Sequence, residues 1–381
     1  TQSRSSAASD VYKRQVTGIT GQDGSHLADL LLSKGYEVVG ITRRTSTDNT
    51  GRIKHLLDHD NFQLESGDVT DVSSIIRILK KHSDPMQTEF YNLAAQSHVG
   101  ESFKQPGATW DITGKGALNI LQSIVDLNMK HIRFYQASSS EMFGASCDTD
   151  TNPNQKIGKM ERYQDENTKF LPQSPYAIAK CAAHYMTRLF REGYGLHASA
   201  GILFNHEGPR RGDAFVTRKI TKWIGEYHKF KRQGVVYSSV LHKPSLTEDP
   251  DYIYRVEHNK ILEFPKLRLG NLEAFRDWGY AGDYVEGMWM MLQQKDPDDY
   301  VICTGETHTI REFLDIAFEH IGIKDWTQYV VVDQEFYRPA EVDYLRGRNK
   351  KARENLGWTP KHSFKDLVKL MVDHDTKPTK E

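Results

Sequence analysis

The sequence predicts an α/β protein with a doubly wound parallel sheet and a second, smaller α/β domain. From Val16 to about Leu203, short β-rich runs alternate with stretches of helical periodicity, the pattern of a parallel sheet covered on both faces. A glycine-rich turn and an amphipathic helix follow the first run. After Phe204 this alternation breaks, and 381 residues exceed what one domain usually contains.

The elements of the first domain follow in chain order. Leu27, Leu30 and Leu31 mark the first helix, and Gly35 closes it. The remaining strands are expected at 36–42, 62–68, 89–95, 131–137 and 196–204, with helices beginning near residue 72 and spanning 114–128. We therefore assign 16–204 to the first domain, to which a segment near 275–305 could return, and 205–381 to the second, with 145–170 as a long polar loop and 229–266 as an insertion.

The composition excludes several functional classes. Lys and Arg total 50 against 51 Asp and Glu, so there is no electrostatic footprint for nucleic acid or a membrane surface. No apolar run approaches the length of a membrane span. Cys147, Cys181 and Cys303 are scattered, without disulfide or zinc spacing. We predict a cytoplasmic protein without a metal site.

The first fifteen residues, TQSRSSAASDVYKRQ, are polar and basic. They resemble translated adapter or vector sequence, so we expect a non-native tail; a native disordered tail is an equal alternative. Lys13 and Arg14 would be costly in a central strand that is buried on both faces. We therefore expect the native strand to begin around Val16.

Gly18, Gly21 and Gly24 fall at GxxGxxG spacing directly before the first helix. In a Rossmann-type fold, such glycines allow a tight turn and close approach of a pyrophosphate, which the helix N-terminus faces. Three glycines alone can be only a turn, but the strand–turn–helix context favours a dinucleotide site.

The end of the second strand indicates which dinucleotide the site prefers. An Asp or Glu there would hydrogen-bond the ribose of NAD, but this sequence has Arg43 and Arg44. Guanidinium groups suit a 2′-phosphate, so we predict NADP; the alternative is a solvated basic turn. Asp68, after the third strand, is placed to reach the adenine.

The stretch SPYAIAK predicts the catalytic helix. Ser174 is a good N-cap, Pro175 a good first helical residue, and Tyr176 and Lys180 share one helix face. A lysine charge, with a positive nicotinamide ring, is expected to lower the pKa of the tyrosine and make it a usable base. By itself, such a pair is often only a surface pair.

The stretch QASSSEMFG lies at the end of a predicted strand, at the sheet edge where α/β sites gather. Ser139 and Ser140 can hydrogen-bond a substrate hydroxyl. Glu141 is unnecessary for simple hydride transfer but useful if a second proton must move, as in an elimination. The alternative is a loop glutamate with purely local hydrogen bonds.

Cationic residues recur in several later segments and could converge on a diphosphate, although each alone is more often a salt-bridge partner. They are Arg210, Arg211, Arg218, Lys219, Arg276 and Arg338, with Asn205, His206 and Glu341 nearby in the sequence.

Together these segments resemble the extended short-chain dehydrogenase/reductase family and, within it, the GDP-mannose 4,6-dehydratases. The resemblance covers residues 16 to about 373 through blocks such as TGITGQDGSHLADLLLSKGYEVVGI, NTGRI, YNLAAQSHV, YQASSSEMFG and YRPAEVDYLRG. It implies catalytic roles for Ser139, Glu141, Tyr176 and Lys180. It implies NADP binding by Gly18, Gly21, Gln22, Asp23, Gly24, Arg43, Arg44, Asp68, Val69, Leu93, Ala95, Ser97, Tyr176, Lys180, His206 and Arg211. It implies GDP-mannose binding by Asn205, Val216, Lys219, Arg276, Arg338 and Glu341.

The implied reaction converts GDP-mannose to GDP-4-keto-6-deoxymannose and water, a first step towards GDP-fucose and other GDP-deoxyhexoses. The stretch RRTSTDNTGRI resembles a family loop near a subunit interface, which implies a homodimer or homotetramer. Two departures are Ala108, where the family has a tyrosine near the cofactor, and the length of 145–170 and 229–266. A nucleotide-sugar 4-epimerase and a non-catalytic dinucleotide sensor remain alternatives; Glu141 argues against the first and the complete catalytic set against the second.

Overall fold

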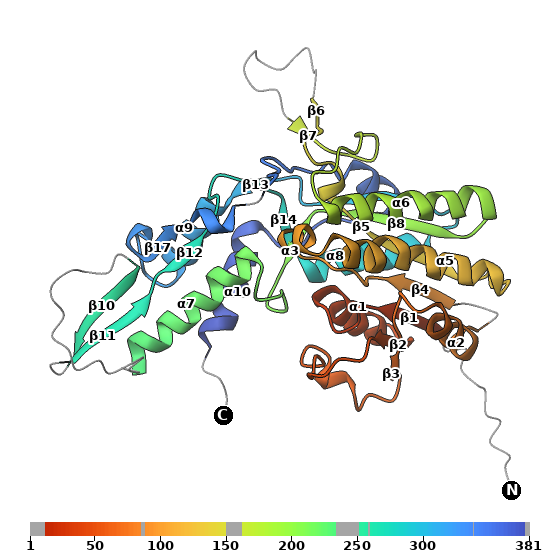
Figure 1. The fold of residues 1–381 in the computed structure, drawn as a ribbon, viewed down its shortest axis with the longest axis horizontal. Helices are drawn as coiled ribbons and strands as arrows, with labels where there is room; N and C mark the ends of the chain where they lie inside the picture. The colour runs from red at the N-terminus through yellow and green to blue at the C-terminus, as the bar shows by residue number, and fades with distance from the viewer. Residues whose placement is uncertain are drawn as a thin grey trace, which may run out of the picture.

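The computed structural model describes residues 12–84, 88–149, 162–233, 251–257, 260–337 and 339–377. A large parallel sheet with its helices forms one lobe, and a smaller lobe lies beside it (Figure 1). The expected tail residues 1–11 lie outside the described residues, as do 150–161 of the long loop.

The sheet of the large lobe has seven parallel strands in the order β15-β8-β5-β4-β1-β2-β3. This confirms the predicted doubly wound fold. β15 comes after the predicted first domain in the sequence, yet it pairs with β8 at the edge of this sheet. The chain therefore returns from the smaller lobe to the sheet of the large lobe. The strands are β1 (Lys13–Thr17), β2 (Glu37–Thr42), β3 (Phe62–Ser66), β4 (Thr88–Asn92), β5 (Arg133–Ser139), β8 (Ala198–Leu203) and β15 (Tyr300–Ile302).

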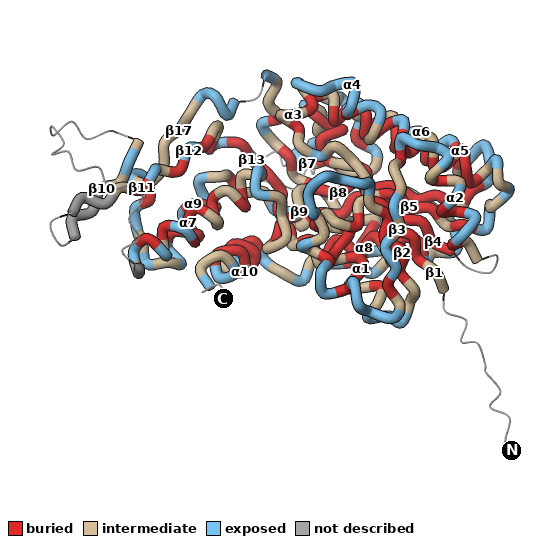
Figure 2. The backbone as a smooth tube through the Cα atoms, turned by 60° about the horizontal axis from the view of Figure 1, so that its bottom comes forward, coloured by how far each residue is buried: buried red, intermediate tan, exposed pale blue. Residues whose placement is uncertain are grey.

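Helices cover both faces of this sheet, and its central strands are buried, drawn red in Figure 2. α1 (Gln22–Ser33) and α8 (Ala281–Gln293) pack on one face, around Leu27 and Met288. α2 (Val72–His82), α5 (Gly116–Asp126) and α6 (Pro175–Tyr194) pack on the other, around Ile78, Ile120 and Phe190. Two short helices, α3 (Val99–Lys104) and α4 (Pro106–Thr109), precede α5.

Local sequence explains why α6 begins and ends where it does. Ser174 Oγ accepts the backbone N–H of Ala177 at 3.1 Å, and Pro175 occupies the first helical position. Gly195 closes the helix with a φ of 69°. Tyr176 and Lys180 therefore lie in the first turns of α6, at the end of the helix that lies near the carboxyl ends of the strands.

The structure differs from the sequence-based expectation at the start of the fold. β1 begins at Lys13, three residues before the expected Val16, and Arg14 is only 1% exposed. The charged side chain is accommodated because it forms an ion pair with Glu89 on the neighbouring strand. The non-native origin of residues 1–15 stays a prediction.

The smaller lobe is built mainly from the second half of the chain. α7 (Val216–Gln233), α9 (Ile310–His320) and α10 (Phe364–Thr376) enclose an apolar core that includes Trp223 and Phe318. The expected insertion 229–266 contains the end of α7 and an antiparallel hairpin of β10 (Tyr252–Glu257) and β11 (Lys260–Pro265).

Short strand pairs connect the rest. They are β6 (Asp148–Thr149) with β7 (Arg162–Tyr163), β9 (Asn205–Glu207) with β14 (Trp278–Tyr280), β12 (Leu267–Leu269) with β17 (Val330–Val332), and β13 (Phe275–Arg276) with β16 (His308–Thr309). Among the described helices, none combines the length and the apolar character needed to cross a membrane.

Candidate active site

The glycine-rich turn joins β1 to α1 and packs against the end of β4. Gly18 has a φ of 67°, in the left-handed region that glycine tolerates. A Cβ on Gly24 would lie 2.4 Å from the carbonyl oxygen of Gly18, so this position requires glycine. Leu93 and Ala94 donate backbone N–H groups to Thr17 Oγ1 at 3.0 and 3.1 Å. The turn is thus held against the strand end, with the α1 N-terminus available to phosphate groups.

Gln22 and Asp23, at the start of α1, contact the segment that leads into the smaller lobe. His206 Nε2 lies 2.8 Å from Asp23 Oδ2, and His206 Nδ1 lies 2.7 Å from the Phe204 carbonyl oxygen. Burial opposes the charged form of His206, but Asp23 outweighs it and raises the pKa of His206. Burial alone would raise the pKa of Asp23, yet His206 holds it well below its usual range. The pair therefore carries opposite charges, which neutralises the carboxylate where phosphates are expected.

A hollow of about 600 Å³ lies beyond the carboxyl ends of β2 and β3. It brings the predicted cofactor residues Arg43, Arg44 and Asp68 together. Val69 is buried and packs beneath Gly116 of α5. The hollow is lined by Arg43, Arg44, Ser66, Gly67, Asp68, Asp71, Ser73, Ser74 and Arg77.

The predicted catalytic residues come together at the carboxyl end of β5. Ser139 is the last residue of this strand, and its Oγ accepts the backbone N–H of Glu141 at 3.2 Å. Ser139 also hydrogen-bonds the side chain of Tyr176, which is 8% exposed. Glu141 is 9% exposed. A hydroxyl, a carboxylate and a phenol thus share one buried corner, as the sequence predicted.

The pKa values at this corner are dominated by burial. Burial raises the pKa of Tyr176 to about 12; the Ser139 hydrogen bond lowers it and Glu141 raises it further. Burial lowers the pKa of Lys180 to about 8. Lys180 Nζ donates to the Ala137 carbonyl at 2.6 Å and lies 5.7 Å from the centre of the Tyr176 ring. In the protein without its cofactor, burial is thus the larger effect on the tyrosine pKa. The lowering expected from Lys180 together with a nicotinamide ring stays a prediction.

Three of the predicted cations form ion pairs within the protein. Arg210 pairs with Asp29 at 2.7 Å, and Arg211 pairs with Glu207 at 3.0 Å. Arg218, which is mostly buried, pairs with Asp375. Each of these arginines has a carboxylate partner of its own.

Other predicted substrate residues lie in separate elements. Arg276, on β13, pairs with Glu341 at 2.8 Å. Asn205, on β9, has a buried Oδ1 without a hydrogen-bond partner, and Val216 is half-buried at the start of α7. Arg338 lies outside the described residues.

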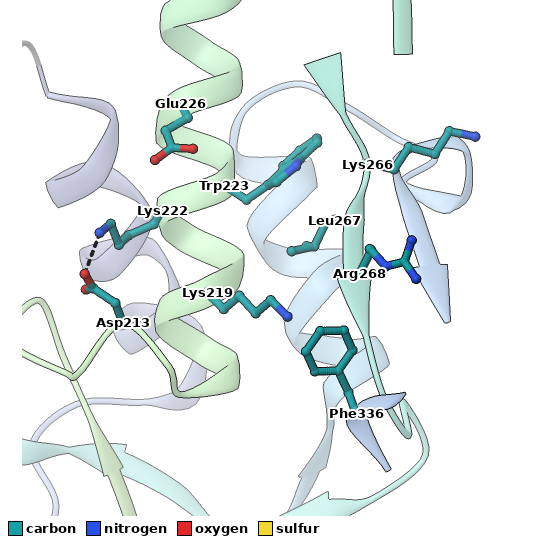
Figure 3. Close-up of a pocket in the computed structure, with 9 residues that line it drawn as sticks. All are labelled: Asp213, Lys219, Lys222, Trp223, Glu226, Lys266, Leu267, Arg268 and Phe336. Atoms are coloured by element: carbon teal, nitrogen blue, oxygen red, sulfur yellow. Dashed lines mark hydrogen bonds and ion pairs between the residues drawn. The ribbon is translucent and has the colours of Figure 1, made fainter. Parts of the chain in front are cut away.

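A second hollow, of about 370 Å³, lies between α7 and β12 (Figure 3). Lys219, a predicted substrate residue, reaches from α7 toward Phe336, with its Nζ 3.6 Å from the ring centre. Lys222 turns instead to Asp213, at 2.6 Å. This hollow suits a nucleotide, because the lysine cation attracts phosphates and the aromatic ring packs against a base. Phe336 was not predicted from the sequence, because nothing local connects it to Lys219.

Asp277 is a further residue that the sequence pattern did not reveal. It is completely buried, and burial raises its pKa to about 6. Its carboxylate accepts backbone N–H groups from Thr304, Gly305 and Gly347 at 2.8, 2.9 and 3.1 Å. Asp277 thereby links its own segment, next to Arg276, to the segments around residues 304 and 347. The only sequence signal was its place directly after that arginine.

A comparison with protein families decides the relationship. A family described as GDP-mannose 4,6 dehydratase matches residues 16–258 and 249–371. The chain belongs to this family. Among its relatives, GDP-mannose 4,6 dehydratase 1 of Arabidopsis thaliana is 46% identical, with 96% of this chain and 91% of the relative aligned. The human GDP-mannose 4,6 dehydratase is 41% identical, over 94% of this chain and 90% of the relative.

Solved structures agree on the fold of this dehydratase-family chain. A dTDP-glucose 4,6-dehydratase from Bacillus anthracis, in complex with NAD, has a TM-score of 0.71 at 18% identity and covers 96% of each chain. A Thermotoga maritima UDP-glucose 4-epimerase also has a TM-score of 0.71, at 23% identity, covering 95% of this chain and 98% of that one. At these identities the likeness concerns the fold, which dehydratases and epimerases share.

Proposed function

We propose that this chain converts GDP-mannose to GDP-4-keto-6-deoxymannose and water, with NADP as its bound cofactor. The observation that carries the proposal is the grouping of Tyr176, Ser139 and Glu141 in a member of the dehydratase family. Oxidation of the sugar hydroxyl needs one acid–base group, which the tyrosine provides. The buried carboxylate supplies the second acid–base group that loss of water requires.

The described residues fit NADP. The glycine turn and the α1 N-terminus suit the pyrophosphate, because a Cβ on Gly24 would collide with the backbone of the turn and the helix start offers N–H donors. Arg43 and Arg44 line a hollow at the position where a 2′-phosphate is expected. When bound, NADP supplies the oxidation at carbon 4 and the later reduction at carbon 6, and it is regenerated in each turnover.

The first proton transfer falls to Tyr176. Its Oη takes the proton of the sugar 4-hydroxyl, while the Ser139 hydroxyl hydrogen-bonds the 4-oxygen. Because burial raises the pKa of Tyr176 to about 12, the tyrosine needs nearby positive charge to act as a base. Lys180 supplies one such charge from the next turn of α6.

The second proton transfer falls to Glu141. The 4-keto group makes the proton on carbon 5 acidic, and the Glu141 carboxylate removes it. The same carboxyl group then gives its proton to the departing 6-hydroxyl, so that one water leaves. Reduction at carbon 6 requires a proton at carbon 5, and Tyr176 returns the one it took from the 4-hydroxyl, so that both side chains end the turnover as they began it. We assign the nucleotide end of the substrate to Lys219 and its hollow, with Asn205, Val216, Arg276, Arg338 and Glu341 as further binding residues.

A product analysis tests the function. Incubation of the purified protein with GDP-mannose should give a nucleotide sugar that is lighter by one water, as measured by mass spectrometry. A product of unchanged mass with an inverted 4-position would identify a 4-epimerase and overturn the proposal. The assay should be run with and without residues 1–11, which belong to the predicted non-native tail and precede β1 in the sequence.

We also propose a cytoplasmic homodimer or homotetramer. Three large apolar side chains, Ile178, Tyr185 and Leu189, are each more than half exposed along α6. Apolar surface gathered on one helix favours association. Light scattering should give a mass of at least two chains, and a mass of one chain at assay concentration would contradict the prediction.

A further inference from the structure

The hollow beyond β2 and β3 receives an arginine from a third element. Arg77 lies on α2, outside the segment from which the sequence predicted phosphate binding, and lines the same hollow as Arg43 and Arg44. Its Nη2 donates to the Ser66 carbonyl at 2.5 Å, and its Nη1 donates to Glu65 Oε2 at 3.3 Å. A guanidinium has more N–H donors than these two contacts use. Arg77 is therefore oriented by β3 and retains donor capacity.

The hollow also contains two carboxylates, and their hydrogen bonds decide its character. Asp68 Oδ1 accepts the backbone N–H and the hydroxyl of Thr70, at 2.9 and 2.8 Å. Asp71 Oδ1 accepts the same two groups of Ser73, at 3.0 and 2.6 Å. Both acids are thus occupied by their own turns rather than by the arginines of the hollow.

The arginines are less fully engaged. Within the described part of the chain, Arg43 and Arg44 form no ion pair and are exposed. Glu65, the partner of Arg77, is shared with Lys81 and His82, at 2.6 and 2.9 Å. One carboxylate therefore serves three basic side chains, and positive charge is left over at this edge of the sheet.

We propose that Arg77 is a specificity residue, which binds the 2′-phosphate of the cofactor together with Arg43 and Arg44. The inference rests on the proposed use of NADP. Three guanidinium groups from two elements can surround a dianionic phosphate, whereas the ribose hydroxyls of NAD offer them no charge. Arg77 thereby contributes to the choice between the two dinucleotides.

Binding of two small probes tests this role without an activity assay. Isothermal titration of the full chain with 2′,5′-ADP and with 5′-ADP isolates the contribution of the 2′-phosphate. Arg77→Met should weaken 2′,5′-ADP by roughly 10-fold or more and leave 5′-ADP within about 2-fold, because one charge-assisted contact is lost. Arg77→Lys should lie between these values, because it retains the charge without the forked geometry.

Lys81→Met is the matched control. Lys81 shares the Glu65 contact and lies one helical turn after Arg77, but it does not line the hollow. This variant should bind both probes as the unchanged protein does. Equal weakening of both probes in Arg77→Met, equal effects in Lys81→Met, or no effect at all would overturn the role of Arg77. If the unchanged protein does not prefer 2′,5′-ADP, the proposed use of NADP fails instead.

Discussion

Replacing Tyr176 with Phe should lower kcat for GDP-mannose by about 10²- to 10⁴-fold, the usual contribution of a general acid–base group. The substitution removes one oxygen from a buried ring and retains the ring itself. The Ser139 hydrogen bond to the phenol is lost, but the ring packing in the first turn of α6 is kept. Initial rates of product formation, measured by mass spectrometry, give the change in kcat.

Tyr194→Phe is the control for this substitution. Tyr194 is the last residue of the same helix, is 41% exposed, and has no place in the proposed chemistry or the proposed association surface. It should leave kcat within about 2-fold, because surface changes rarely matter. Binding of 2′,5′-ADP to Tyr176→Phe should also be unchanged, since residues of α6 do not line the hollow beyond β2 and β3. Turnover retained by Tyr176→Phe would contradict the assigned role.

The features that the sequence predicted correctly are local ones. The glycine turn, the Ser174 cap and the Tyr176–Lys180 spacing each depend on residues a few positions apart. Their meeting with Ser139 and Glu141 follows from the rule that the carboxyl ends of parallel strands form one edge. For these reasons, both the fold and the grouping of Ser139, Glu141 and Tyr176 could be predicted from the sequence alone.

The features that the sequence did not reveal depend on contacts between distant segments. Arg77 meets Arg43 only because β2 and β3 are neighbours, and Phe336 meets Lys219 across the smaller lobe. Asp277 joins segments around residues 304 and 347. The raised pKa of Tyr176 has the same origin, since burial is a property of the packed structure. Spacing along the chain carries no information about such contacts.

The start of β1 shows this limit most clearly. The charge of Arg14 predicted that this residue does not lie in a buried strand. In the structure, however, Arg14 and Glu89 are register partners on β1 and β4. Arg14 Nε lies 2.6 Å from Glu89 Oε2, and the guanidinium lies 4.1 Å from the centre of the Tyr36 ring. Tyr91 and Gln293 donate to the same carboxylate at 2.6 and 3.0 Å. The cost of burial is offset by these partners, which surround both charges.

Removing one member of this buried pair should be strongly destabilising. Arg14→Ala leaves the Glu89 carboxylate buried without its cation, which should lower the free energy of unfolding by about 3–5 kcal/mol. Urea unfolding followed by tryptophan fluorescence and by circular dichroism would measure the loss and show whether the two lobes unfold together.

The double variant Arg14→Leu with Glu89→Gln separates the charge effect from loss of packing. It removes both charges while keeping an amide oxygen for Tyr91 and an apolar side chain in β1. A buried ion pair is often replaceable by neutral groups without loss, so this variant should lie within about 1 kcal/mol of the unchanged protein. If Arg14→Ala alone has no effect, β1 does not bury this side chain in solution. The sheet would then begin at Val16, as polarity alone had suggested.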